Sequence, residues 1–219
     1  MGPALELFFG TSNQGKLREL RRLVEGLPVV VVTPEALGAP LPEVVEDGAS
    51  FRENAEKKAR AFALASGRVA LADDSGLCVD ALDGAPGIFS ARWSEAEVPG
   101  ALPRQERDRH NNQKLLAALA GQPTGRRGAA YLAVLSLAAP DGSILASVEG
   151  RCRGRIGAEP RGGDGFGYDP LFVAEGRVLT MAELTPAEKD GVSHRGAAFR
   201  ALRPVLERLA ALDEARGNR

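Results

Sequence analysis

A short apolar run that passes directly into two aspartates constrains this chain more than any other feature. Residues 69–72 read Val-Ala-Leu-Ala and are followed by Asp73, Asp74, Ser75 and Gly76. This pattern predicts a buried strand that delivers acidic side chains to the carboxyl edge of a sheet. Because neighbouring strand residues point to opposite faces, one aspartate faces a site and the other holds the turn. For the pair alone, an acidic hairpin turn is the alternative interpretation.

The residues that follow these aspartates favour a hard cation over zinc. Two more acids, Asp80 and Asp83, precede a Gly-Ala-Pro-Gly turn, and Arg92 lies beside the only tryptophan. Residues 70–93 contain no histidine, and their cysteine does not belong to a CxxC pair. Carboxylate oxygens are the ligands that Mg²⁺ prefers, so we expect Mg²⁺ here.

Length and composition are those of a single globular domain. The chain has 219 residues, 44% of them apolar and 26% charged, and no linker-like tract divides it. A net charge of −1 argues against nucleic acid or a membrane as partner. Cys78 and Cys152 predict free thiols in a reducing compartment. Without a signal sequence or an apolar run near ~18 residues, we expect a cytoplasmic protein.

A polar turn near the amino terminus has the composition of a phosphate-binding loop. Residues 5–9 predict a strand, and the leucines among residues 17–24 recur at helical spacing. Between them lie Thr11, Ser12, Asn13, Gln14, Gly15 and Lys16. Backbone N–H groups at a helix start bind phosphate, and Lys16 would add a point charge. A plain helix cap, with Asn13 as the N-cap residue, explains these residues equally well.

The remaining segments predict alternating helices and strands. Residues 29–32 predict a strand, and residues 39–48, rich in proline and acids, predict a loop. Ser50 opens a capping-box sequence, Ser-Phe-Arg-Glu, and a helix to about Ala65. An exposed connection is expected over residues 94–103, which are acidic and then rich in proline and glycine.

In the second half of the chain we expect two helices around a hairpin. Residues 104–119 and 197–212 have amphipathic helical spacing. Residues 129–138 and 144–152 are apolar or alternating runs joined by Pro-Asp-Gly, which favours a hairpin. A row of arginines over residues 151–161 resembles a phosphate-binding stripe, but the near-neutral chain favours a solvated edge strand.

Two further segments suggest nucleotide recognition. Residues 162–167 hold four glycines, and Phe166 and Tyr168 can stack on a flat ring. A tight loop with two anchoring aromatic residues is the alternative interpretation. Residues 189–196 place His194 and Arg195 just before the last predicted helix, which favours recognition of an anion or a base.

Together these motifs meet the requirements of a site for a nucleoside triphosphate and Mg²⁺. Six segments, in this order, resemble the non-canonical purine nucleoside triphosphate pyrophosphatases, the ITP/dITP/XTP pyrophosphatase family that sanitises nucleotide pools. The segments are residues 11–16, 50–55, 72–77, 84–92, 165–170 and 193–196. The resemblance covers nearly the whole chain.

The resemblance implies an α/β fold with a long mixed central β-sheet flanked by helices. It implies one domain, residues 1–219, whose two lobes surround a nucleotide-binding cleft, and a homodimer. It also implies hydrolysis of ITP, dITP and XTP to the monophosphate and pyrophosphate with Mg²⁺, which keeps deaminated purines out of DNA and RNA.

The resemblance assigns roles to individual residues. Asp74 is implied to be metal ligand and proton acceptor, and Ser75 to touch the substrate. The phosphates are assigned to Thr11, Ser12, Asn13, Gln14, Gly15 and Lys16. The base and sugar are assigned to Phe166, Gly167, Tyr168 and Asp169. Base and phosphate are read by Lys189, His194 and Arg195.

The chain departs from the family pattern at the second metal ligand. Many relatives carry adjacent glutamates just before the glycine that corresponds to Gly48, and one of them binds the metal. Here Val45 interrupts that pair, so the second carboxylate is Glu43 or Glu46. We favour Glu46.

Two other functions compete with this interpretation. A metal-dependent aspartyl phosphatase needs an Asp-x-Asp pair at the strand end, whereas this chain has Asp-Asp-Ser. A nucleotide sensor without turnover, or an RNA-binding module, would use similar residues, but the near-zero net charge argues against RNA.

Overall fold

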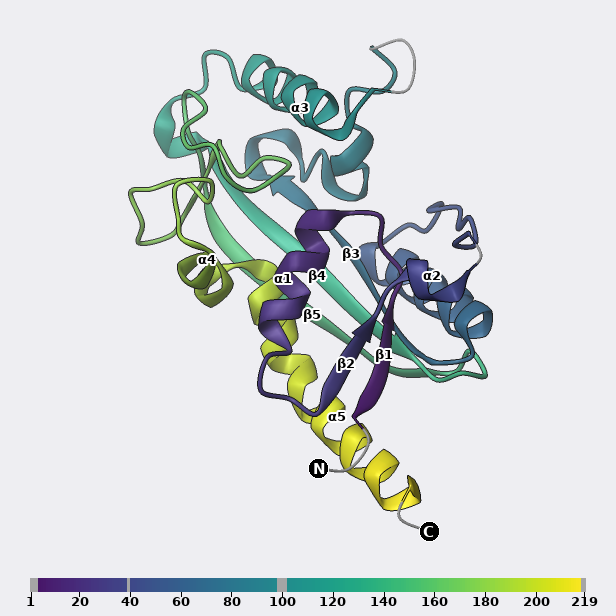
Figure 1. The fold of residues 1–219 in the computed structure, drawn as a ribbon. Coiled ribbons are helices and arrows are strands. Elements are labelled where there is room, and N and C mark those ends of the chain that lie inside the picture. The colour runs from purple at the N-terminus through teal and green to yellow at the C-terminus, as the bar shows by residue number, and fades with distance from the viewer. Residues whose placement is uncertain (1–3, 39, 98–101, 218–219) are drawn as a thin grey trace. The chain divides into compact units, whose positions relative to one another are not determined.

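The computed structural model describes residues 4–38, 40–97 and 102–217. Its helices and strands are β1 (Leu5–Phe9), α1 (Gln14–Leu23), β2 (Val29–Val32), α2 (Phe51–Ser66), β3 (Val69–Val79), α3 (Arg104–Ala118), β4 (Gly128–Ala138), β5 (Ile144–Ile156), β6 (Phe172–Ala174), α4 (Pro186–Val192) and α5 (His194–Gly217) (Figure 1). The strands form one sheet in the order β2-β1-β3-β4-β5-β6. Strand β1 is parallel to β2 and β3, whereas β5 and β6 are antiparallel, so the expected mixed sheet is confirmed.

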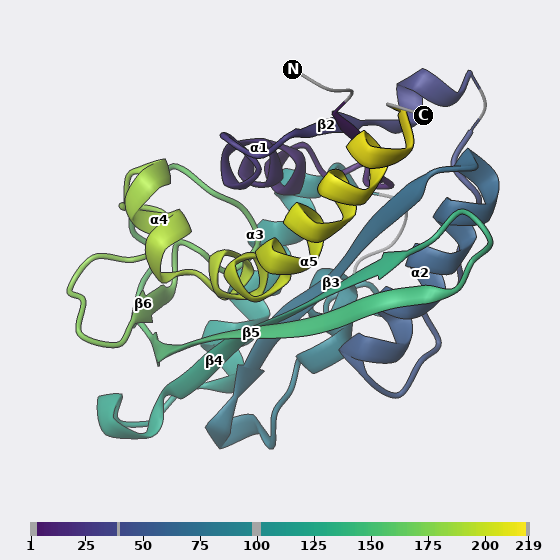
Figure 2. The ribbon, with the colours of Figure 1, turned by 90° about the horizontal axis from the view of Figure 1, so that it is seen from below.

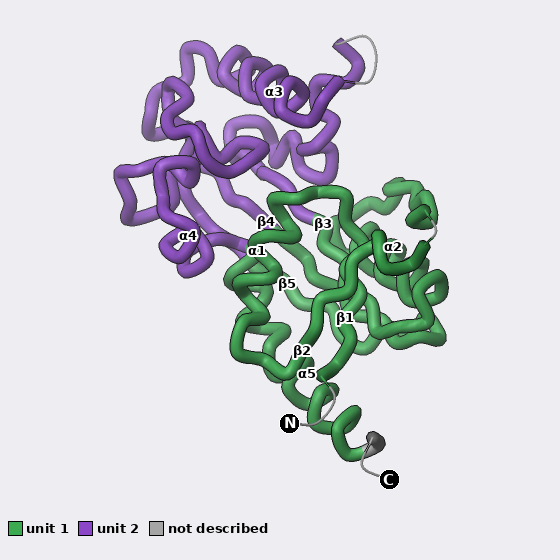
Figure 3. The backbone as a smooth tube through the Cα atoms, in the orientation of Figure 1, with its two compact units in different colours: residues 1–74, 133–150, 195–219 green, residues 75–132, 151–194 purple. Residues whose placement is uncertain are grey.

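The chain divides into two compact units (Figure 3). Unit 1 comprises residues 1–74, 133–150 and 195–219, and unit 2 comprises residues 75–132 and 151–194. Strands β3, β4 and β5 each contribute residues to both units.

The sheet of unit 1 is covered by helices on both faces (Figure 2). Because successive strand residues point to opposite faces, Leu7 and Leu71 pack with α1 and α5, whereas Phe8 and Ala70 pack with α2. The ring of Phe8 meets that of Phe62 edge to face, with centroids 6.3 Å apart. This alternation decides which helix each side chain of β3 meets.

Unit 2 has a core of its own around the other ends of the same strands. Leu77 and Tyr131 are buried there with Leu115 of α3 and with Leu171 and Met181 of the segment that precedes α4. The glycine-rich loop at residues 162–167 therefore leads directly into a packed core at Tyr168 and Leu171.

Most elements agree with the sequence-based prediction. Strands at residues 5–9 and 29–32 are confirmed, and α2 begins after Ser50, whose hydroxyl accepts the Glu53 N–H at 3.2 Å. The hairpin is confirmed as β4 and β5, neighbours joined by a tight turn at residues 139–143. Of the loop predicted over residues 39–48 and the connection predicted over residues 94–103, Ala39 and residues 98–101 lie outside the described residues.

Two predicted boundaries are wrong, and the edge-strand prediction is wrong in part. Strand β3 does not end at the aspartates but continues to Val79, so Asp73 and Asp74 lie in its middle. Helix α5 begins at His194 rather than Ala197. Of the arginine row, Arg151, Arg153 and Arg155 lie in β5 and Arg161 follows it; β6 pairs with β5 only at residues 154–156, so the edge-strand prediction fails only there. Among the described residues, no helix is long and apolar enough to cross a membrane.

Candidate active site

The turn at residues 11–16 forms the capped start of α1. The Asn13 side-chain oxygen accepts the N–H groups of Gly15 and Lys16 at 3.0 and 3.3 Å, and the Thr11 hydroxyl accepts that of Asn13 at 3.1 Å. The N-cap prediction is confirmed. Asn13 is buried, and its amide Nδ2 has no acceptor within the described chain. A buried donor at a helix start is a suitable partner for an anion, and the phosphate-binding role stays a prediction.

Asp73 lies on the face of β3 that α1 and α5 cover. Lys16 of α1 donates to Asp73 Oδ1, and Arg195 of α5 donates to Asp73 Oδ2 at 2.8 Å. Arg195 also pairs with Glu19, which is buried on α1. Burial alone would raise the pKa of Asp73, but Arg195 and Lys16 outweigh it and hold that pKa well below its usual range. Asp73 is therefore an ionised anchor that links two helices to the strand.

Asp74 points to the other face, towards α2. Lys58 donates to Asp74 Oδ1 at 2.8 Å, to Glu46 Oε1 at 2.9 Å and to the Asp73 carbonyl oxygen at 2.9 Å. The Asn54 amide approaches Asp74 Oδ2 at 3.5 Å. Burial raises the pKa of Asp74, and Lys58 opposes this only in part. A carboxylate with a raised pKa is a stronger base than an exposed aspartate.

The two aspartates thus divide as strand geometry requires. One faces α1 and α5 and the other faces α2, which confirms that they do not serve one face together. We expected one aspartate to hold the turn, and this expectation is wrong. Asp73 instead holds the two helices that carry Lys16 and Arg195.

Glu46 and Asp74 have the donor chemistry of a magnesium site. Both carboxylates contact the Lys58 ammonium group. Their oxygens therefore lie close enough together to bind one cation. Within the described residues no group of three His, Cys, Asp or Glu side chains converges. Mg²⁺ is commonly bound through one or two carboxylates together with substrate phosphates, and this pair fits that pattern. Glu43 is exposed, which favours Glu46 as the second ligand.

Sequence reasoning missed Lys58 and Glu19, whereas Asn54 and Lys57 were expected near the start of α2, facing either the cleft or water. Asn54 and Lys58 are four residues apart on α2, and that spacing puts both on one helix face, directed at Asp74. Lys57 is exposed and pairs with Asp47 instead. The helical register of α2, taken with its apolar inner residues, was the available signal.

In unit 2, the loop around Phe166 is built on Asp169. Asp169 Oδ2 accepts the Phe166 N–H at 2.9 Å and the Lys189 ammonium at 2.6 Å. The same ammonium lies 4.9 Å from the centre of the Phe166 ring. Phe166 is half-buried, whereas Tyr168 is buried and donates its hydroxyl to the Ser90 carbonyl oxygen at 3.0 Å. Of the two rings, Tyr168 is an anchor and Phe166 is the one with an accessible surface.

His194 and Ser75 complete the predicted set in unit 2. The His194 ring is buried and stacks on Tyr131, with centroids 4.6 Å apart and an interplanar angle of 11°. Ser75 follows Asp74 in β3 and is half-buried. The structure therefore gathers Lys189, Phe166 and Asp169 closely, and places His194 against the core of the same unit.

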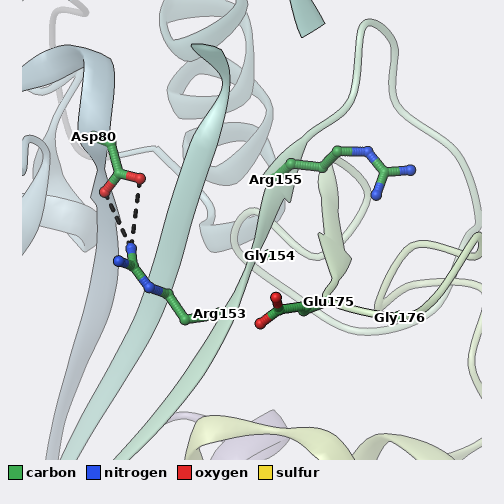
Figure 4. A pocket seen from close by; sticks show the side chains of 6 residues that line it. All are labelled: Asp80, Arg153, Gly154, Arg155, Glu175 and Gly176. Atoms are coloured by element: carbon green, nitrogen blue, oxygen red, sulfur yellow. Dashed lines mark hydrogen bonds and ion pairs between the residues drawn. The ribbon is translucent and has the colours of Figure 1, made fainter. Parts of the chain in front are cut away.

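A pocket of about 280 Å³ in unit 2 contains none of the predicted site residues (Figure 4). It is lined by Asp80, Arg153, Gly154, Arg155, Glu175 and Gly176. Arg153 donates to both Asp80 oxygens, at 3.2 and 3.4 Å. Two acids balance the two arginines, so the arginine row offers no excess positive charge for a triphosphate there.

Comparison with known proteins is consistent with these observations. The sequence profile of the Ham1 family matches residues 7–205. A dITP/XTP pyrophosphatase of Anaeromyxobacter dehalogenans is 58% identical, over 94% of this chain and 99% of that protein. One from Streptomyces coelicolor is 47% identical, over 93% and 98%.

Solved structures give the same result. A HAM1 protein from Coxiella burnetii is 38% identical, with a TM-score of 0.78 over 92% of this chain and 98% of that one. A nucleoside-triphosphatase, or dITP/XTP pyrophosphatase, from Mycobacterium abscessus is 44% identical, with a TM-score of 0.69 over 92% and 100%.

Proposed function

This chain belongs to the Ham1 family, and on that premise we propose that it hydrolyses non-canonical purine nucleoside triphosphates. The substrates are dITP, ITP and XTP, and the products are the nucleoside monophosphate and pyrophosphate. This reaction removes deaminated purines from the pool that supplies DNA and RNA synthesis.

The arrangement of Asp73, Asp74 and their cations carries this proposal. Two adjacent carboxylates on opposite faces of one strand are both buried, and each contacts a lysine. One is held ionised as an anchor, and the other has a raised pKa beside a second carboxylate. Hydrolysis of a phosphoanhydride needs such a base, a divalent cation and fixed positive charge.

In unit 1, each group has a step to perform. Glu46 and Asp74 would hold Mg²⁺, which neutralises phosphate oxygens when bound. Asp74 would accept a proton from the attacking water. The helix start at residues 11–16 would bind phosphate oxygens through the buried Asn13 Nδ2 and the Lys16 ammonium. Arg195 adds positive charge and fixes Asp73, which in turn orients Lys16.

In unit 2, the groups around Phe166 suit a purine. The half-buried ring offers a surface for stacking, and Lys189 beside it can only donate hydrogen bonds. A donor favours the 6-oxo group of hypoxanthine or xanthine and opposes the 6-amino group of adenine. An unpaired buried donor costs about 1–3 kcal/mol, so a few such contacts separate ITP from ATP.

We also propose a homodimer in the cytoplasm. Static light scattering of the purified protein should then give twice the 23.0 kDa mass of one chain. A mass of one chain at micromolar concentration would contradict the dimer.

A panel of nucleoside triphosphates tests the proposed reaction. We would measure the release of pyrophosphate and of phosphate separately from ITP, dITP, XTP, GTP and ATP, with Mg²⁺ and with a chelator. The proposal predicts pyrophosphate from the first three, and activity that the chelator abolishes. Direct release of phosphate would indicate a phosphatase. Binding of ITP without turnover would indicate a sensor.

A further inference from the structure

Helix α3 reaches the base-binding loop through two side chains that the assigned site does not include. Asp108 Oδ2 accepts the backbone N–H of Gly167 at 2.8 Å. Asn112 Nδ2, one turn along the helix, donates to the Gly167 carbonyl oxygen at 2.8 Å. Both backbone groups of one loop residue are therefore bound to neighbouring turns of the same helix.

Gly167 is the point in the loop where such a clamp has most effect. Its φ of +62° lies in the left-handed region, which side chains disfavour, although a Cβ there would meet no atom within 4 Å. The backbone conformation at this position therefore requires glycine, whereas the space around it would admit a side chain. Because glycine is also the residue with the widest choice of conformations, external bonds are needed to hold it in this one.

Helix α3 is itself fixed independently of the loop. Asn111 accepts the Ser94 N–H at 2.9 Å and donates to the Ser90 carbonyl oxygen at 3.2 Å, and Leu115 is fully buried. The helix is therefore a rigid reference for the loop, and not a part of it.

From this geometry we propose that Asp108 and Asn112 are positioning residues for base recognition. They set the conformation of Gly167 and thereby the direction of the Phe166 ring on one side and of Asp169 on the other. Neither residue is assigned to contact the substrate. This inference rests on the proposed function, because it assumes that Phe166 and Asp169 bind the base.

Arg104 supports this interpretation from the same helix. Its guanidinium lies 5.3 Å from the centre of the Phe166 ring, and its Nε is 3.8 Å from Asp108 Oδ2. Asp108 thus holds the loop backbone and restrains a cation next to the ring. Asn112 donates instead to the carbonyl oxygens of Asp108 and Gly167, both at 2.8 Å, so its substitution loosens Gly167 from the other side.

The test compares Asp108→Ala, Asp108→Asn and Asn112→Ala with Gln113→Ala, an exposed position on the same helix. For Asp108→Ala and Asn112→Ala we expect the KM for ITP to rise about tenfold, with kcat within about threefold of the parent. Inhibition by pyrophosphate, which has no base, should be unchanged. Asp108→Asn keeps an oxygen acceptor and should restore most of the affinity.

Amide hydrogen exchange supplies a readout that does not depend on activity. Exchange in the segment 165–170 should accelerate in Asp108→Ala and Asn112→Ala but not in Gln113→Ala, while exchange in α3 stays as in the parent. Unchanged exchange in the loop would overturn the clamp. An equal rise in the KM for ITP and the inhibition constant for pyrophosphate would overturn its link to the base.

The parent protein separates this inference from the proposed function. If the parent hydrolyses no purine triphosphate, the proposed function fails before any variant is made. If the parent hydrolyses ITP and the Asp108 and Asn112 variants behave like Gln113→Ala, the inference alone fails.

Discussion

The two units differ in how their charged side chains are paired. Unit 1 holds a network in which Glu19, Arg195, Asp73 and Lys16 alternate in sign, and Lys58 joins Asp74 to Glu46 beside it. Unit 2 holds a buried ion pair, Lys189 with Asp169, next to aromatic rings. The first arrangement suits a multiply charged phosphate chain and a metal ion. The second suits a flat, uncharged base with a few polar edges.

The difference also predicts how each region responds to substitution. A buried charge that loses its partner is destabilising, because no water replaces the lost contact. Substitution of Asp73 or Asp74 in the unit 1 network should therefore affect stability or turnover strongly. Substitutions around Phe166 should mainly change the preference among bases.

The largest effect is expected for Asp73→Asn. This change leaves Lys16 and Arg195 buried without their shared carboxylate, and should lower the free energy of unfolding by about 3–5 kcal/mol. Urea denaturation followed by circular dichroism measures it. Asp80→Asn is the control, since Asp80 pairs with Arg153 on the surface and should cost at most about 1 kcal/mol. Equal losses would contradict the anchoring role of Asp73.

Asp74→Asn should affect turnover rather than folding. The substitution keeps the shape of the side chain but removes a metal ligand and the proposed proton acceptor, so kcat should fall at least about 100-fold. Steady-state release of pyrophosphate from ITP, with a thermal melt of the same sample, checks both parts. Activity within a few-fold of the parent would remove Asp74 from the mechanism.

Lys189→Ala should change selectivity. Loss of the donor beside Phe166 should lower kcat/KM for ITP more than for ATP, and so shrink their ratio by about 5- to 150-fold, or ~1–3 kcal/mol. Lys114→Ala, a partly exposed lysine of the same unit that pairs with Glu97, serves as control. A parallel fall in the rates for ITP and ATP would make Lys189 a phosphate or folding residue.

Lys16→Ala should give the smallest of these effects. The triphosphate should bind about tenfold more weakly, whereas inosine monophosphate should be much less affected, because Lys16 is assigned to the phosphate tail. Isothermal titration calorimetry in the Asp74→Asn background measures both ligands without turnover. Arg18→Ala, exposed on the same helix, is the control. Equal losses for both ligands would place Lys16 elsewhere.

Local signals in the sequence predict the elements well. Alternating apolar residues, Ser50 with Glu53 and the Pro-Asp-Gly turn each act over a few residues, and all three were confirmed. The family resemblance is likewise confirmed by the Ham1 profile. The sequence predicted the end of β3 at the aspartates, which is too early. Two aspartates are unfavourable in a buried strand unless distant residues neutralise them.

Those distant residues are what local patterns do not contain. Asp73 is matched by Arg195, 122 positions later, and Asp74 by Lys58 from another helix. Lys58 looks like its neighbour Lys57 in the sequence, yet the side chain of Lys58 is 11% exposed and pairs with Asp74, whereas that of Lys57 is 48% exposed. Only the helical register of α2 against β3 separates them. The clamp from Asp108 and Asn112 to Gly167 is non-local in the same way.

The division of labour between the two units is tested most directly by one set of kcat/KM values. ITP, XTP and ATP would be measured with the parent protein, Asp74→Asn and Lys189→Ala under identical Mg²⁺. Asp74→Asn should lower all three values by a common factor and leave their ratios unchanged, whereas Lys189→Ala should change the ratios. If Asp74→Asn altered the ratios, or Lys189→Ala lowered all three values in parallel, chemistry and base selection would not be divided in this way.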